Sequence, residues 1–142
     1  MYPSLIGSGG LIGWNSGGEV TRSLSKGNIE SRASENSSNI NVGGLIGYCE
    51  KLNKYNEEKL SNIKNCYSKC NVWAEATGNV TGRNKTGRVT AGGFAGEIFN
   101  CTGDGYVVDV FTFGDVYARG NYSGAERDYS FFGRFCGSES NN

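Results

Sequence analysis

Apolar and polar positions recur along this chain at a spacing of a little over forty residues. Three ten-residue segments carry β-branched or aromatic residues at the same places, and they begin at Val20, Ile63 and Val107, so the steps are 43 and 44 residues. Residues of these types are typical of strands. We therefore expect the three segments to be strands that pair side by side, with their last apolar positions also aligned at Ile29, Val72 and Val116.

A glycine-rich block precedes each of these segments. The copies are Gly9-Gly-Leu-Ile-Gly13, Gly43-Gly-Leu-Ile-Gly47 and Gly92-Gly-Phe-Ala-Gly96, and a degenerate fourth copy is Ser130-Phe-Phe-Gly133. A fixed period is typical of stacked repeats, in which one unit alone cannot bury its apolar face. The sequence thus predicts an all-β repeat solenoid, similar to a right-handed parallel β-helix, with about three periods of 43–44 residues plus the degenerate terminal copy. Each period could form one wide coil or two narrow ones.

A single domain over residues 1–142 is predicted, because this length suits one core. Its copies would lie near 9–42, 43–91 and 92–129, with a partial copy at 130–137. The connection inside the second copy is the longest and contains the charged run Glu50 to Leu60. Insertions in solenoids map to loops, so this run is expected to be a surface loop or a short helix.

One polar position is shared by all three copies. Asn28, Asn71 and Asp115 occupy it. Side chains stacked in this way can bond from one coil to the next, as in other assemblies of stacked strands. We predict a structural polar ladder at a corner of the solenoid, with no binding role.

Two aromatic residues are the candidate binding site. If the apolar position before them points inward, strand alternation turns Glu30, Trp73 and Tyr117 outward, where the two rings would stack. Exposed Trp and Tyr are favoured anchors at binding surfaces. This face is the predicted contact for a glycan or a protein, and ordinary packing against a loop or a neighbouring domain is the alternative.

The blocks resemble the GLUG repeats of bacterial surface and secreted proteins. That pattern runs roughly Gly-Gly-Leu-Val-Gly, then Asn-Cys-Tyr-x-x-Gly-x-Val, and residues 43–47 and Asn65-Cys-Tyr67 are similar to it. The first and third copies depart at Arg22-Ser-Leu24 and Asp109-Val-Phe111. The resemblance implies an extracellular β-rich module of the kind found in adhesins and beside the catalytic domains of immunoglobulin-cleaving metallopeptidases. It implies no catalytic residue in this chain.

Composition excludes several functions. The 14 basic and 14 acidic side chains cancel, so nothing attracts nucleic acid or an anionic membrane surface. Histidine is absent, which excludes Ser–His–Asp and Cys–His catalysis and histidine-bound zinc. No run approaches the roughly 18–20 apolar residues of a membrane span. Met1 to Gly10 lacks the features of a secretion signal, so an extracellular or cell-surface location requires a signal outside this chain or another export route.

The five cysteines predict neither a metal site nor a cofactor. Cys66 and Cys70 would lie about 13 Å apart in an extended strand, beyond the roughly 7 Å that a disulfide allows. No second cysteine pair completes a zinc site, so both are expected in the core. Cys49, Cys101 and Cys136 leave one disulfide open.

Carboxylates and glycosylation motifs add little. Asp104, Asp109 and Asp115 are the densest acidic group, but a glycosidase needs two carboxyls roughly 5–10 Å apart, one of them with a raised pKa. Nothing in the sequence builds that pair, and solvated surface positions are favoured. Five Asn-x-Ser/Thr motifs would mark glycan-bearing loops only in a eukaryotic secreted protein; they begin at Asn36, Asn79, Asn84, Asn100 and Asn121.

The sequence therefore predicts a non-enzymatic extracellular module for adhesion, display or surface assembly. Its partners would be a host or matrix glycan or protein, or copies of itself, without nucleic acid. Two alternatives remain open. One is a self-assembling filament subunit whose open strand edges stack, and the other is a carbohydrate-active enzyme with carboxylates on the solenoid face.

Overall fold

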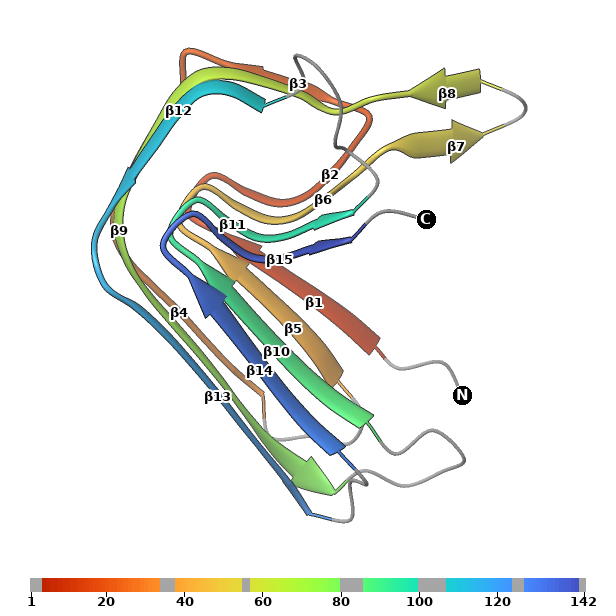
Figure 1. The fold of residues 1–142 in the computed structure, drawn as a ribbon, viewed down its shortest axis with the longest axis vertical. Coiled ribbons are helices and arrows are strands. Elements are labelled where there is room, and N and C mark those ends of the chain that lie inside the picture. The colour runs from red at the N-terminus through yellow and green to blue at the C-terminus, as the bar shows by residue number, and fades with distance from the viewer. Residues whose placement is uncertain are drawn as a thin grey trace.

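The computed structural model describes residues 4–33, 38–54, 57–79, 86–99, 107–123 and 127–140. Within them every regular element is a β-strand (Figure 1). The first pass of the chain contains β1 (Ser4–Gly9), β2 (Ile12–Ser16), β3 (Glu19–Thr21) and β4 (Leu24–Ala33). The second contains β5 (Ser38–Gly43), β6 (Ile46–Glu50), β7 (Leu52–Lys54), β8 (Glu57–Lys59) and β9 (Asn62–Asn79). The third contains β10 (Thr86–Gly92), β11 (Ala95–Phe99), β12 (Val107–Phe113) and β13 (Val116–Ser123), and the fourth β14 (Arg127–Gly133) and β15 (Cys136–Ser140).

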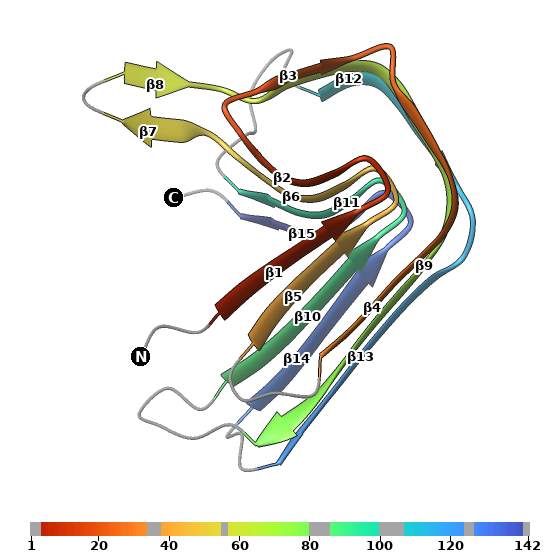
Figure 2. The ribbon, with the colours of Figure 1, turned by 180° about the vertical axis from the view of Figure 1, so that it is seen from behind.

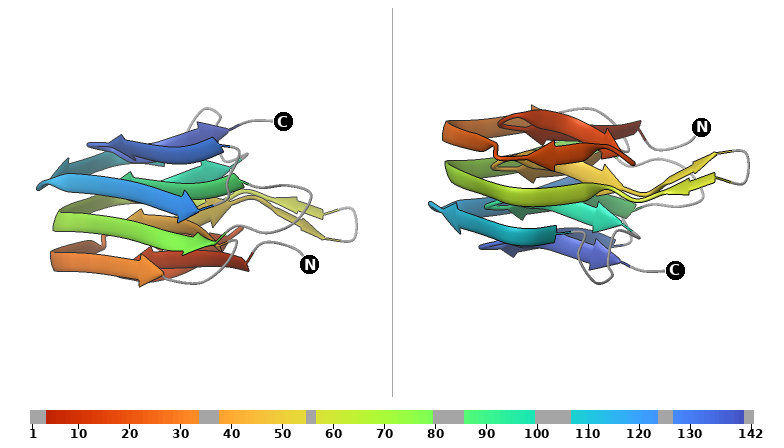
Figure 3. Two further views of the ribbon diagram at one scale, coloured as in Figure 1. Left: turned by 90° about the horizontal axis from the view of Figure 1, so that it is seen from below. Right: turned by 90° about the horizontal axis from the view of Figure 1, so that it is seen from above.

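Each pass of the chain, called a coil below, contributes strands to the same stacked parallel sheets. Sheet A has the order β1-β5-β10-β14, and sheet B has β15-β11-β6-β2. In sheet C the long strand β9 lies between β3 and β4 of the first coil and β12 and β13 of the third. Figure 3 shows the coils as successive layers. The all-β class and parallel pairing are thereby confirmed, and the arrangement is consistent with a β-helix-like fold.

The predicted alignment of the strands is confirmed by the register of sheet C. Val20 pairs with Ile63 and Ile63 with Val107, and the last apolar positions pair in the same way, with Val72 between Ile29 and Val116. Partners in sheet C are 43 or 44 residues apart, so one full pass of the chain separates them. The register is specified because a one-residue slip would turn the buried set of side chains outward.

The cross-section of the stack is bent and encloses two apolar cores. Sheets A and B meet at a sharp corner that points into the bend of sheet C (Figures 1 and 2). Sheet B packs against the first part of sheet C around Ile46, Ile63 and Phe94. Sheet A packs against the second part around Ile40, Val72 and Val89.

The glycine pairs lie at this corner because no side chain fits there. Ser25 donates a hydrogen bond from its hydroxyl to the carbonyl of Gly44, so the corner touches sheet C. A Cβ on Gly93 would lie 2.5 Å from Oγ1 of Thr112. Close approach of two chain segments thus explains the recurrence of the second glycine. Arg134 takes this position in the fourth coil, where the described residues include no strand of sheet C.

For the charged run after β6 the sequence predicts a surface loop or a short helix, but the described part of the run forms two strands instead. Its arms β7 and β8 pair as an antiparallel hairpin that projects from the stack (Figure 1). The chain must return at once to start β9, and Ser61 donates a hydrogen bond to the carbonyl of Glu50 at 2.7 Å. A hairpin brings its two ends together, whereas a helix separates them by about 1.5 Å per residue. No helix in the described residues is long and apolar enough to cross a membrane.

Candidate binding face

The second half of sheet C presents alternating side chains to the core and to solvent. In β9 the residues Cys70, Val72, Ala74 and Ala76 are buried. The residues between them point outward, and the parallel register continues each outward position across three coils. Three outward rows result: a ladder row of Asn28, Asn71 and Asp115, an aromatic row of Glu30, Trp73 and Tyr117, and a charged row of Arg32, Glu75 and Arg119.

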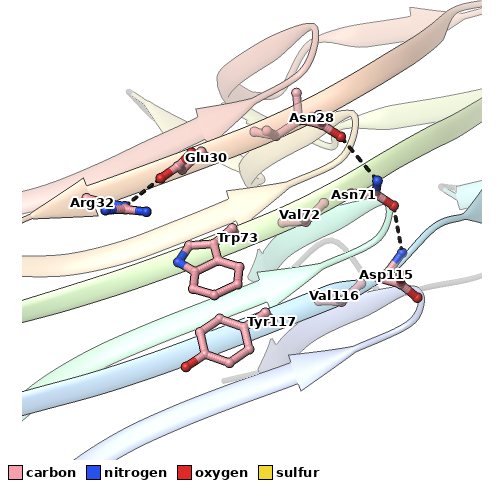
Figure 4. Close-up of a pocket in the computed structure, with 10 residues that line it drawn as sticks. Asn28, Glu30, Arg32, Asn71, Val72, Trp73, Asp115, Val116 and Tyr117 are labelled. Atoms are coloured by element: carbon pink, nitrogen blue, oxygen red, sulfur yellow. Dashed lines mark hydrogen bonds and ion pairs between the residues drawn. The ribbon is translucent and has the colours of Figure 1, made fainter.

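A pocket of about 550 Å³ lies on this face between the ladder row and the aromatic row (Figure 4). Ile29, Val72 and Val116 contribute its floor. Val72 is buried, and the other two are partly buried and pack against the same core. Its lining is Asn28, Ile29, Glu30, Arg32, Asn71, Val72, Trp73, Asp115, Val116 and Tyr117. The pocket therefore unites every side chain that the sequence singled out as ladder or binding residue.

The two rings of the aromatic row stack on each other. The centroids of Trp73 and Tyr117 are 4.0 Å apart with an angle of 24° between the planes. The residues remain 40% and 37% exposed, respectively. In the first coil Glu30 stands at the position of the rings, so this row contains no third ring. Mutual stacking thus uses one face of Trp73 and leaves the other directed toward the first coil.

Hydrogen bonds join the ladder row along the stack. Asn71 donates from Nδ2 to Oδ1 of Asn28 at 3.1 Å, and its own Oδ1 accepts from the backbone N–H of Asp115 at 3.1 Å. These bonds hold the amide of Asn71 in place as one wall of the pocket. Among the described residues, neither the NH₂ group of Asn28 nor the carboxylate of Asp115 has a partner.

The charged row carries alternating charges. Nε of Arg32 lies 2.5 Å from Oε1 of Glu30 and 3.9 Å from Oε2 of Glu75, and Nη1 of Arg119 lies 4.0 Å from Oε1 of Glu75. The Arg32 and Glu30 side chains are 65% and 54% exposed, and exposed ion pairs of this kind stabilise a fold by only about 0–1 kcal/mol. Both groups can therefore exchange partners with little loss of stability.

The other candidate groups stay apart from the pocket. Asp109 has φ 53°, and the equivalent Arg22 and Asn65 have φ 49° and 54°, so the position serves a left-handed bend in sheet C. Asp104 lies outside the described residues. In the part of the chain that the structure describes, no group of three or more His, Cys, Asp or Glu side chains could hold a metal ion.

The thiols of four cysteines are placed in or against the cores. Cys49, Cys66 and Cys70 are buried and Cys136 is partly buried, and none of the four forms a disulfide. The prediction that Cys66 and Cys70 form no disulfide is confirmed. Burial raises the pKa of the Cys136 thiol to about 11. Cys101 lies outside the described residues, as do the motif residues Asn36, Asn84 and Asn100.

Sequence reasoning missed Arg32 as a pocket residue and assigned the ladder row no part in binding. Strand alternation would have found Arg32, because it lies two positions beyond Glu30 on the same face. The same rule identifies a further outward row of Leu24, Tyr67 and Phe111, whose members are exposed but do not line the pocket.

No protein-family model, no curated protein and no solved structure matches this chain.

Proposed function

We propose that the chain is a non-enzymatic binding module of an extracellular or cell-surface protein, built as a right-handed repeat solenoid. The outer face of sheet C would contact the partner, and the role would be adhesion, display or surface assembly. The resemblance to GLUG repeats supports the extracellular setting. One observation carries the proposal: the exposed stack of Trp73 and Tyr117 forms one wall of a pocket whose other wall is a row of amide and carboxylate groups.

The pocket suits a ligand with an apolar face and polar edges. Aromatic contacts contribute about 0.5–1.5 kcal/mol beyond the burial of their area, and the facing amides can form hydrogen bonds. Such a site is weak by itself because the ligand loses translational and rotational freedom on binding. Display of several copies along a surface would raise the avidity without any new contact.

The carboxylates of the pocket suit binding better than glycoside cleavage. Glu30 and Asp115 are two coils and one row apart, so the strand spacings place their Cα atoms about 12 Å from each other. Glycosidases hold their two carboxyl groups roughly 5–10 Å apart. Glu30 also forms an ion pair with Arg32 at 2.5 Å. Neither group has the apolar surroundings of a general acid.

Binding of the intact chain to a glycan array and to a panel of immobilised extracellular-matrix proteins tests this proposal. We expect binding that a Trp73→Ala, Tyr117→Ala double variant loses. Undiminished binding by the double variant would remove this face from consideration. Release of sugar from a polysaccharide, abolished by changing Asp109 or Asp115 to Asn, would overturn the non-enzymatic function itself.

A further inference from the structure

One face of Trp73 in the pocket has no aromatic ring stacked on it. Tyr117 covers the opposite face of the indole at 4.0 Å. Toward the first coil the next residue in the row is Glu30, and its carboxylate is drawn to Arg32 at 2.5 Å. Figure 4 shows Glu30 and Arg32 beyond the indole on this side, with no ring stacked there. Four of the ten pocket residues, including Arg32, belong to the strand β4 of this coil.

The first-coil residues that line the pocket carry hydrogen-bond donors and acceptors. Asn28 brings an NH₂ group without a partner among the described residues, Arg32 brings an exposed guanidinium, and Glu30 brings an exposed carboxylate. A group that both donates and accepts hydrogen bonds can satisfy all three. Hydroxyl groups have this property, and neighbouring hydroxyls on one ring can bridge Glu30 and Arg32 at once.

The charges of the pocket favour a neutral ligand. Its lining contains two carboxyl side chains, Glu30 and Asp115, and one guanidinium side chain, Arg32. A polyanion would meet two carboxylates against a single cation that already has a partner. A cationic side chain would have to compete with Arg32 for Glu30. A neutral polyhydroxyl ring avoids both costs, and its C–H face can lie on the indole.

We infer that the first-coil end of the pocket is a subsite for one pyranose ring of a neutral glycan. The ring stacks on the free face of Trp73, and its hydroxyls bond to Asn28, Glu30 and Arg32. Tyr117 supports the indole from behind and fixes its orientation. This inference rests on the proposed function, because it names the ligand of the same binding face.

Affinity electrophoresis of the intact chain tests the ligand class. The probes are three neutral polysaccharides (dextran, galactomannan and xyloglucan) and two acidic ones (polygalacturonate and heparin). We expect retardation by at least one neutral polysaccharide and by neither acidic one at physiological salt. Retardation by an acidic polysaccharide alone, or by none of the three neutral ones, would overturn the inference.

Variants assign the contacts. Trp73→Ala should weaken binding at least tenfold, Glu30→Gln and Arg32→Gln each several-fold, and Tyr117→Leu less than Trp73→Ala. Tyr67→Ala is the matched control, because Tyr67 is an exposed aromatic residue on the same sheet outside the pocket. In a Trp14→Phe background Trp73 is the sole tryptophan, so its emission should shift when the neutral polysaccharide binds.

The two proposals fail in different ways. If the Trp73→Ala, Tyr117→Ala double variant loses binding while Glu30→Gln and Arg32→Gln keep it, the face binds but the subsite is wrong. Loss of matrix-protein binding in the double variant, with no retardation by neutral polysaccharide, would keep the binding module and reject the sugar. Equal binding by wild type and the double variant would reject both.

Discussion

Arg88 and Glu97 form an ion pair of 2.7 Å between the outer faces of sheets A and B. The Glu97 side chain is 5% exposed and the Arg88 side chain 30%. Arg88 also donates to Oγ of Ser138 at 2.7 Å, and its guanidinium carbon lies 5.5 Å from the ring centroid of Phe131. The sharp corner between the two sheets therefore buries polar groups on what would otherwise be a solvent face, and Arg88 ties the sheets together.

Removal of one partner of this pair should be costly. Arg88→Met leaves the buried Glu97 carboxylate without its cation, and we expect the free energy of unfolding to fall by about 2–4 kcal/mol. The Arg88→Met, Glu97→Met double variant should recover most of this loss, because a pair of apolar side chains leaves no buried charge. Urea denaturation of the two variants measures both values. A loss of less than about 0.5 kcal/mol for Arg88→Met would show that the pair does not hold the sheets together.

The last glycine of each glycine-rich block should tolerate substitution by alanine less well in an inner coil than in the outermost first coil. A Cβ on Gly96 would lie 2.5 Å from both the carbonyl oxygen of Gly47 and the amide nitrogen of Val42. Backbone cannot move aside cheaply, so Gly96→Ala should destabilise the fold by about 3 kcal/mol or more. Gly13 holds the equivalent position in the first coil, where the nearest atom, the Gly7 oxygen, is at 2.8 Å.

Gly13→Ala is therefore the matched control and should cost clearly less than Gly96→Ala. Thermal unfolding followed by circular dichroism ranks the two variants. Equal losses would mean that close approach at the corner does not explain why the glycines recur.

Much of this structure could be predicted from two features of the sequence, the recurring spacing and the alternation of side chains along a strand. Each aligned position becomes a row across the coils, so the pairing of Ile63 with Val107 and the outward stack of Trp73 on Tyr117 followed from counting residues. A repeat encodes its own register, because each copy has the same buried and exposed positions. The direction of each side chain was therefore predictable. The pocket between the rows was not, because no sequence motif indicated it.

The bend of the cross-section was not predictable in this way. Arg88 and Glu97 are nine residues apart on strands of two different sheets, and they meet only because the corner at Gly92 and Gly93 is sharp. That sharpness depends on the fit of the corner against Thr112 in another part of the coil. Repeat spacing gives the length of a coil and leaves its shape undetermined. The hairpin β7–β8 was missed for a related reason, since its pairing depends on where the chain must re-enter the stack.

Substitution of Cys66 tests the role of a buried thiol. Cys66 is 1% exposed, and its thiol donates to the carbonyl of Lys64 at 3.1 Å. A serine hydroxyl can use the same acceptor, so Cys66→Ser should lower the free energy of unfolding by about 1 kcal/mol, the small end of the cost of burying a hydroxyl. Cys66→Val copies Val110 of the next coil and should be nearly neutral. A loss above about 3 kcal/mol for the serine variant would mean that its hydroxyl finds no partner.

The thiol of Cys136 should make stability fall at high pH. Burial raises the pKa of this thiol from 9.0 to about 11, so the folded chain keeps the proton that the unfolded chain releases. The contribution of this thiol to the free energy of unfolding is therefore complete below pH 9. It is lost as the pH rises from 9 toward 11, and the total loss is about 2–3 kcal/mol.

Other groups also titrate in that range, so the measurement is a difference between wild type and Cys136→Ala, the residue that Ala95 provides at the equivalent position. Urea denaturation at intervals from pH 8 to 11 should show the stability of the wild type falling relative to that of the variant. Two parallel curves across this range would show that the thiol ionises equally readily in the folded and unfolded chains.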